Sequence, residues 1–192
     1  MIDPAVIDAL VAALTDPSRA DPPGQFPSDP VAAARPGLYS WWVEEEAHEV
    51  ISLQLRTEID SLIYAGQAGA TRQPSGTPSK ATLRSRIKQN HINGNDYSST
   101  FRLTLSAVLL EPLGLLVMKP SRLTPESRAH VSGWIKRHLR VAVVPYDDRD
   151  ELAEVEHAVL AVLDPPLNLD GRPFTPARTR LRDLRRRVTH PE

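Results

Sequence analysis

Three short segments rich in apolar, β-branched and aromatic residues predict β-strands, and the helical segments between them limit how the chain can fold. The predicted strands are residues 37–43, 62–66 and 140–145. Residues 80–91 and 148–163 have the apolar spacing of helices and follow the second and the third strand. This order predicts an α+β domain in which helices pack on a small central three-stranded sheet.

The remaining segments predict a helical start, a proline-rich arm and a helical insert. Residues 5–15 have helical spacing, whereas residues 16–36 contain six prolines, which prevent regular structure and indicate an extended arm. Thr124, followed by proline and glutamate, is a typical helix start. Residues 44–61 are compatible with a helix or a strand, and both remain open. We divide the chain into an N-terminal helix and arm (1–35), a central domain (36–170) that contains the helical insert (97–139), and a basic C-terminal tail (171–192).

Composition and charge exclude several kinds of site. The chain has 192 residues, a formal net charge of −1 and no cysteine. The lack of cysteine excludes disulfides, a cysteine nucleophile and cysteine-ligated zinc. The net charge excludes a uniformly basic surface. Residues 172–187 nevertheless hold seven arginines against one acid, so this stretch is either a nucleic-acid contact or a solvated helix face.

No segment predicts export or membrane insertion. The first residues lack the basic stretch of a secretory signal. The apolar stretch from Leu105 to Met118 is interrupted by Glu111 and Pro112, and it is shorter than the ~20 residues that a membrane span needs. We therefore expect a soluble, cytoplasmic protein with no membrane partner.

Four motifs occur in order along the chain. They are Gly37-Leu38-Tyr39, Tyr64-Ala65-Gly66, Leu83-Arg84-Ser85-Arg86-Ile87, and Glu156 standing nine residues before Pro165 and twelve before Asn168. Each of the first two arises often by chance, but the four in this order and spacing resemble the GIY-YIG nucleases. Leucine and alanine replace the two isoleucines of the family motif, and the linker between the first two motifs is longer than usual. The resemblance covers about residues 36–169 and implies an antiparallel sheet.

The resemblance also implies a role for each motif residue. Tyr39 would take a proton from the attacking water, Tyr64 would orient water or phosphate, and Arg86 would hold a phosphate oxygen. A free phenol has a pKa near ~10, so Tyr39 needs nearby cations to lower its pKa. Glu156 would bind one divalent metal ion, Mg²⁺ or Mn²⁺, because a single carboxylate with waters suits such ions. The residues implied to support the site structurally are Gly37, Gly66 and Asn168.

The place of His91 is left open. Many members of the family carry a histidine four residues after the catalytic arginine, where this chain has Asn90. On an α-helix, a side chain five residues after Arg86 points about 140° away from it. His91 can therefore join the catalytic residues only if the helix ends or tightens before it. Neighbouring helix residues diverge by about 100°, so His157 is expected at the surface rather than beside Glu156.

Substrate binding requires cations outside the motifs. The candidates are Arg72, Lys80, Arg84, Lys88 and Arg102. We expect a metal-dependent endonuclease that acts on DNA in preference to RNA, in repair, restriction or defence, with a protein partner as one source of specificity. Two alternatives remain open, namely a non-catalytic nucleic-acid-binding module and a protein-interaction module on the same fold.

Overall fold

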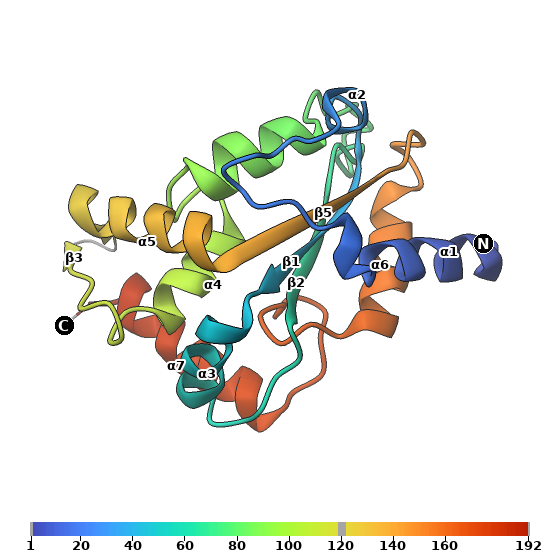
Figure 1. The fold of residues 1–192 in the computed structure, drawn as a ribbon. Coiled ribbons are helices and arrows are strands. Elements are labelled where there is room, and N and C mark those ends of the chain that lie inside the picture. Colours follow the sequence, from blue (N-terminus) through green and yellow to red (C-terminus); the bar gives the residue numbers. More distant parts are fainter. Residues whose placement is uncertain (1, 119–121, 192) are drawn as a thin grey trace.

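A three-stranded antiparallel sheet lies at the centre of the molecule (Figure 1). The structure, a computed structural model, describes residues 2–118 and 122–191. Strand β1 (Gly37–Val43) lies between β2 (Leu62–Ala68) and β5 (Leu139–Pro145) and pairs antiparallel with both. The predicted α+β class, with its small antiparallel sheet flanked by helices, is confirmed.

Helices and a short hairpin surround this sheet. Their bounds are α1 (Pro4–Leu14), η1 (Pro17–Arg19), α2 (Pro30–Ala33), α3 (Glu45–Leu55), η2 (Ser85–Ile92), α4 (Thr100–Val108), β3 (Val117–Met118), β4 (Arg122–Leu123), α5 (Pro125–His138), α6 (Leu152–Leu163) and α7 (Pro176–Thr189). The segment left open as helix or strand forms α3, because Ala47, Ile51 and Leu55 repeat every four residues and are buried on one side. None of the helices in the described ranges is long and apolar enough to cross a membrane.

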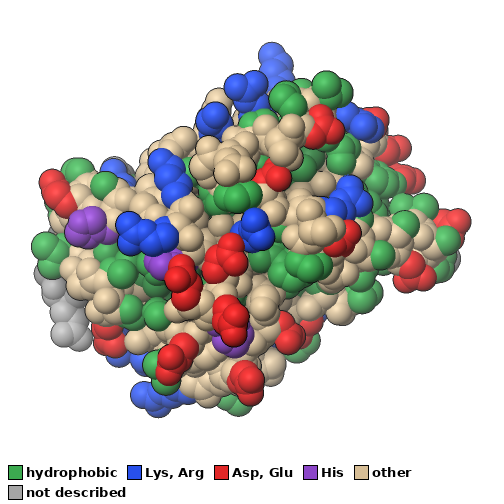
Figure 2. Space-filling view, viewed as in Figure 1, with side chains coloured by type: hydrophobic (Ala, Val, Ile, Leu, Met, Phe, Trp, Pro, Cys, Tyr) green, Lys and Arg blue, Asp and Glu red, His purple; other side chains and the backbone are tan. Residues whose placement is uncertain are grey.

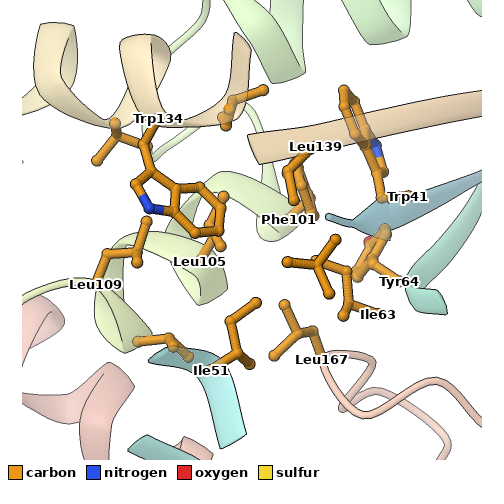
Figure 3. Close-up of a cluster of buried hydrophobic side chains, with 14 of the residues drawn as sticks. Trp41, Ile51, Ile63, Tyr64, Phe101, Leu105, Leu109, Trp134, Leu139 and Leu167 are labelled. Atoms are coloured by element: carbon orange, nitrogen blue, oxygen red, sulfur yellow. The ribbon is translucent and has the colours of Figure 1, made fainter. Parts of the chain in front are cut away.

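The two faces of the sheet bury different clusters of side chains. Successive residues of a strand point to opposite faces. On one face Trp41 stacks on Phe101 of α4, with ring centroids 4.9 Å apart, inside the larger cluster (Figure 3). On the other face Leu38 packs with Leu152 and Val155 of α6 and with the apolar side of α1. The helix α6 is therefore fixed against the sheet by its own buried stripe.

The start of α6 lies four residues later than predicted. Asp148 accepts hydrogen bonds from the backbone N–H groups of Asp150 and Glu151 at 2.9 and 3.1 Å. These bonds form a turn, and the helix begins only at Leu152. An aspartate that caps the backbone in this way favours a turn as readily as a helix start.

The proline-rich arm runs along the outer edge of β5. Asp21 exchanges two backbone hydrogen bonds of 2.9 Å with Val141, so a single residue of the arm extends the sheet there. Phe26 and Ala33, further along the arm, are buried in the larger cluster. The arm is thus packed against the domain over much of its length.

The segment expected to be a helical insert supplies part of the core. Phe101 and Leu105 of α4 and Ile135 of α5 are fully buried. Thr124 caps α5 as predicted, since its hydroxyl accepts the N–H of Ser127 at 3.2 Å.

The basic segment expected to be a tail forms the helix α7 and packs against α4 and α3 (Figure 1). Leu181, Leu184 and Val188 lie along its buried side. Arg178 is also buried, and it donates hydrogen bonds to the Asn168 carbonyl at 3.0 Å and to the Asp164 carboxylate at 2.8 Å. Arg172 also pairs with the Asp164 carboxylate, so two of the seven arginines fix the polypeptide after α6, and the apolar stripe fixes the helix.

Candidate active site

The two tyrosines of the motifs lie side by side on neighbouring strands. The register of β1 and β2 pairs Tyr39 with Gly66 and Trp41 with Tyr64. The rings of Tyr39 and Tyr64 are nearly parallel, with centroids 6.5 Å apart. A side chain at position 66 would place its Cβ 2.7 Å from the Tyr39 hydroxyl oxygen. Glycine at this position therefore leaves the space that the Tyr39 phenol occupies.

The other motif glycine, Gly37, lies where the backbone of β5 comes close to that of β1. A Cβ on Gly37 would lie 2.3 Å from the carbonyl oxygen of Val144 on β5. Any side chain there would push β1 and β5 apart, and Tyr39 lies two residues further along β1. Gly37 thus acts on the site through the pairing of the strands.

His91 reaches the tyrosines because the helix that carries it is a π-helix. Residues 83 and 84 are α-helical, and the rest of the helix has π geometry up to Ile92. Asn93 donates its N–H to the carbonyl of Lys88, five residues back, at 3.1 Å. Five residues then complete about one turn, so His91 lies on the same side of the helix as Arg86. The expectation that the helix must end or tighten before His91 was wrong, since the helix widens instead.

The imidazole of His91 is fully buried between two hydroxyls. Its Nε2 lies 2.8 Å from the Tyr39 hydroxyl oxygen, and its Nδ1 lies 2.6 Å from the Oγ of Ser99. Burial lowers the pKa of His91 well below its usual value, and the charges of Arg86 and Arg102 lower it further. The imidazole is therefore neutral at physiological pH.

Arg102 holds the end of the π-helix and does not face a substrate. It is 1% exposed, and its Nη1 donates to the carbonyls of His91 and Ile92 at 2.9 and 3.0 Å. Its Nη2 donates to the Arg128 carbonyl at 3.1 Å. Burial lowers its pKa to about 10. The prediction of Arg102 as a nucleic-acid contact was wrong, because a basic residue at a helix C-terminus can satisfy the free carbonyls there.

Arg86 lies beside Tyr39 and is half-buried. Its Nε is buried and has no hydrogen-bond partner among the residues that the structure describes. Burial raises the pKa of Tyr39 to about 12, against the opposing charge and hydrogen bond of Arg86. Arg86 therefore does not lower the pKa of Tyr39 below that of a free phenol. The expectation that nearby cations would lower this pKa is not met. The pKa of Tyr64 is also raised, again chiefly by burial.

Glu156 extends from α6 towards the two tyrosines and Arg86. Burial raises its pKa to about 7, while the Arg86 charge and a backbone hydrogen bond from Gln67 oppose the rise. A carboxylate in such a place is costly unless a cation accompanies it. His157, the next residue, is exposed as predicted, but it also lines the same cavity as Glu156, contrary to the expectation that it would lie away from that residue.

These side chains share one cavity of about 440 Å³, which Tyr39, Tyr64, Arg86 and Glu156 line together. His91 lies behind Tyr39 and contacts the cavity through the phenol. Four of the five residues predicted to be catalytic therefore meet in one hollow, and the fifth is hydrogen-bonded to one of them.

Asn168 fixes the edge of β2 beside this cavity. Its Oδ1 accepts the N–H of Ala65 at 3.0 Å, and its Nδ2 donates to the carbonyl of the same residue at 2.9 Å. The side-chain amide thus pairs with the strand as a peptide group would, between Tyr64 and Gly66. This contact gives Asn168 the structural position that the motif implied.

The other predicted nucleic-acid contacts are exposed, namely Arg72, Lys80, Arg84 and Lys88. Arg72 lines a second hollow of about 340 Å³, which shares Gln67 and Arg86 with the main cavity. Elsewhere, lysine and arginine side chains are interspersed with acidic ones, as Figure 2 shows for one face. A nucleic acid would therefore be held by a local group of cations.

The sequence did not predict several residues of this site, among them Ser99, Gln67 and Asp170. Ser99 contacts His91 and also caps α4, and a serine before a helical stretch is a signal that could have located it. Gln67 and Asp170 line the cavity from the ends of two motifs. No sequence signal distinguishes either of them from ordinary surface residues.

The described residues contain no cluster of three or more histidine, aspartate or glutamate side chains that could enclose a metal ion. Glu156 is the carboxylate that burial places in this cavity, so a metal ion here would have it as a protein ligand. Mg²⁺ suits such a site, because it keeps most of its water shell and is often bound by one or two carboxylates together with phosphate oxygens.

One comparison with known proteins gives a match. A family model for the GIY-YIG catalytic domain matches residues 37–187. The match begins at the first motif glycine and runs through most of α7, so it includes the inserted helices. No curated protein and no solved structure shows a significant match to the chain.

Proposed function

The chain belongs to the GIY-YIG nuclease family, and from this premise we propose that it is a metal-dependent endonuclease that hydrolyses phosphodiester bonds in DNA. The observation that carries the proposal is the single cavity lined by Tyr39, Tyr64, Arg86 and Glu156. A hydroxyl pair, a permanent cation and a buried carboxylate are the groups that phosphodiester hydrolysis requires.

Nucleases of this family generally use divalent metal ions, and the donor set here fits one. Glu156 would hold Mg²⁺ or Mn²⁺, since its buried carboxylate has a pKa of about 7 and gains a compensating charge when a cation binds. The bound ion would stabilise negative charge on the phosphate and on the leaving oxygen.

Arg86 would hold a non-bridging phosphate oxygen. The guanidinium remains charged at every physiological pH, and its buried Nε has no hydrogen-bond partner among the described residues. A phosphate oxygen would supply that partner. The guanidinium would stabilise the transition state more than the bound substrate, because the phosphate oxygens carry the most negative charge in the transition state.

Tyr39 would pass a proton from the attacking water to His91. With a pKa of about 12, Tyr39 is a neutral phenol in the resting enzyme. Its O–H can donate to the neutral Nε2 of His91 at 2.8 Å while a lone pair of the same oxygen accepts the proton of water. In this arrangement Nδ1 of His91 carries a hydrogen and donates a hydrogen bond to Ser99 Oγ. Tyr64 would orient the water or the phosphate through its hydroxyl.

One feature of the sequence had kept the alternative of a non-catalytic binding module open. That feature was the spacing of His91, five rather than four residues after Arg86. Because the π-helix brings His91 against Tyr39, the spacing no longer argues for a lost site. The cellular pathway, the cytoplasmic location and a protein partner remain predictions.

The test is cleavage of supercoiled and branched DNA with Mg²⁺ or Mn²⁺, beside a Glu156→Gln protein and an EDTA control. We expect cleavage by the unchanged protein and its loss in both controls. Cleavage that survives Glu156→Gln would contradict the assignment of Glu156. The lack of cleavage of any DNA with either ion would contradict the proposed activity.

A further inference from the structure

The cavity of the candidate active site continues onto the surface of α7. It shares Leu169 and Asp170 with a shallow hollow of about 310 Å³ that is otherwise lined by Arg182, Arg185, Arg186 and Thr189. On its other side the cavity continues into the hollow that ends at Arg72. The three hollows are thus neighbours that share lining residues, and the middle one holds Glu156 and Arg86.

Three arginines line the α7 hollow: Arg186 is exposed, whereas Arg182 and Arg185 are half-buried. The Nη1 of Arg182 is buried and has no hydrogen-bond partner among the residues that the structure describes. Arg182, Arg185, Arg186 and Thr189 are spaced three, four and seven residues from the first, so they lie along one face of the helix. Arg186 pairs with Asp183 on the same helix. Within the described part of the chain, neither Arg182 nor Arg185 forms an ion pair with a carboxylate. Asp170 is the acidic residue among those that line this hollow.

An exposed aromatic ring stands beside these arginines. Phe174 precedes α7 and is 83% exposed, and the guanidinium carbon of Arg182 lies 4.4 Å from its ring centroid. The guanidinium orders one face of the ring and leaves most of the side chain in solvent. A single exposed apolar ring is common on protein surfaces, and what distinguishes Phe174 is the guanidinium of Arg182 that lies over its ring.

We propose that Phe174, Arg182 and Arg185 form a subsite for a single nucleic-acid strand that leaves the candidate active site. The arginines would bind backbone phosphates, and an unpaired base would stack on Phe174, since aromatic rings beside cations are the common means of holding single strands. This inference rests on the proposed nuclease function for its position. The substrate would then be DNA with unpaired nucleotides next to the cleaved bond, such as a flap or a branch.

The experiment measures binding in place of cleavage. In a Glu156→Gln background without metal, fluorescence anisotropy gives the affinity for a labelled 12-nucleotide single strand and for the matching duplex over a range of salt. The variants are Phe174→Ala and Arg182→Gln with Arg185→Gln. Arg137→Gln, an exposed arginine on α5 beside Glu44, Glu45 and Glu46, is the control for charge alone. Melting temperatures show that each variant is folded.

We expect Phe174→Ala to weaken single-strand binding by about 5- to 100-fold and to leave duplex binding within twofold, since one stacked base is lost. The double arginine variant should lower the slope of log affinity against log salt by about 1.4, for two phosphate contacts. Unchanged binding by the folded variants would overturn the subsite, as would an equal effect of Arg137→Gln. An equal loss of duplex binding by Phe174→Ala would overturn base stacking. If these effects appear but the unchanged protein cleaves no DNA, the subsite stands and the proposed function fails.

Discussion

The Nε2 atom of His91 lies 2.8 Å from the hydroxyl oxygen of Tyr39, although the two residues are 52 positions apart. The contact depends on one extra residue in the turn between Arg86 and His91, which the π-helix accommodates. π-helical segments are rare and are found frequently at functional sites. The position of the imidazole is thus set by the hydrogen-bond register of the helix.

Replacing Tyr39 by phenylalanine should abolish cleavage and keep the fold. The ring still fills the space above Gly66, and the buried Nε2 of His91 is left without its partner, which should lower the free energy of unfolding by about 1–3 kcal/mol. We expect the cleavage rate to fall at least ~100-fold, the usual effect of losing a general base. Tyr146→Phe removes a hydroxyl bonded to Glu151, outside the cavity, and should leave the rate unchanged. A tenfold loss or less in Tyr39→Phe would contradict a proton-transfer role.

Deleting Gln89 should convert the π-turn into an α-helical turn and retain cleavage. The exposed Gln89 lies between Arg86 and His91, and its removal places the histidine four residues after the arginine, which is one α-helical turn. We expect the deleted protein to cleave DNA within about tenfold of the unchanged rate. Inserting one alanine after Gln89 should turn His91 away and abolish cleavage. Loss of cleavage in the Gln89 deletion would instead show that the π geometry itself is required.

Glu156→Gln should change the pH dependence of stability. The folded protein holds the Glu156 proton with a pKa of about 7 against 4.5 for a free carboxyl. This stabilisation is therefore complete below about pH 4.5 and is lost as the pH rises through about 7. The neutral glutamine avoids that loss, so the variant should be the more stable protein at pH 8, by at most about 3 kcal/mol, and equal to the unchanged protein near pH 4.5.

Thermal unfolding at both pH values measures this difference, and Mg²⁺ supplies a second readout. At pH 8 the ion should raise the melting temperature of the unchanged protein and not that of Glu156→Gln, because only the carboxylate binds it. Glu154→Gln, an exposed carboxylate on the same helix, is the matched control and should show neither effect. A pH-independent difference between the proteins would contradict the raised pKa of Glu156.

Arg102→Met should destabilise the protein and leave the salt dependence of DNA binding unchanged. The substitution leaves the carbonyls of His91, Ile92 and Arg128 without their donor, which should cost about 3 kcal/mol or more. Chemical unfolding measures that loss. Arg84→Gln, at an exposed position on the same helix as His91, should instead keep the stability and lower the salt slope of DNA affinity. An unchanged stability in Arg102→Met would contradict its structural role.

Local patterns were sufficient to predict the sheet and the elements next to it. The strand β1 was predicted with its observed bounds, because glycine precedes a run of aromatic and β-branched residues. The helix α5 starts where Thr124 and the following proline indicated. The spacing of Glu156 and Asn168 located two residues of the cavity, since both positions follow from one helix and the turn after it.

Features that depend on long-range contacts could not be predicted in this way. The π-helix requires the carbonyls at its end to be satisfied, and Arg102, ten residues further on, does this from inside the core. An arginine in the sequence gives no sign of such burial, so it was interpreted as a phosphate contact. The basic segment after residue 171 likewise concealed the stripe of Leu181, Leu184 and Val188, which fixes it as a docked helix.

Each edge of the small sheet is engaged by residues that are not part of a strand. Asp21 pairs with Val141 on the outside of β5, and Asn168 pairs with Ala65 on the outside of β2. Unpaired strand edges are templates on which chains join side by side. With both edges engaged within the chain, the sheet cannot be lengthened by a strand from a second copy without first displacing one of these contacts. Association of two copies by strand pairing is therefore opposed at both edges of the sheet.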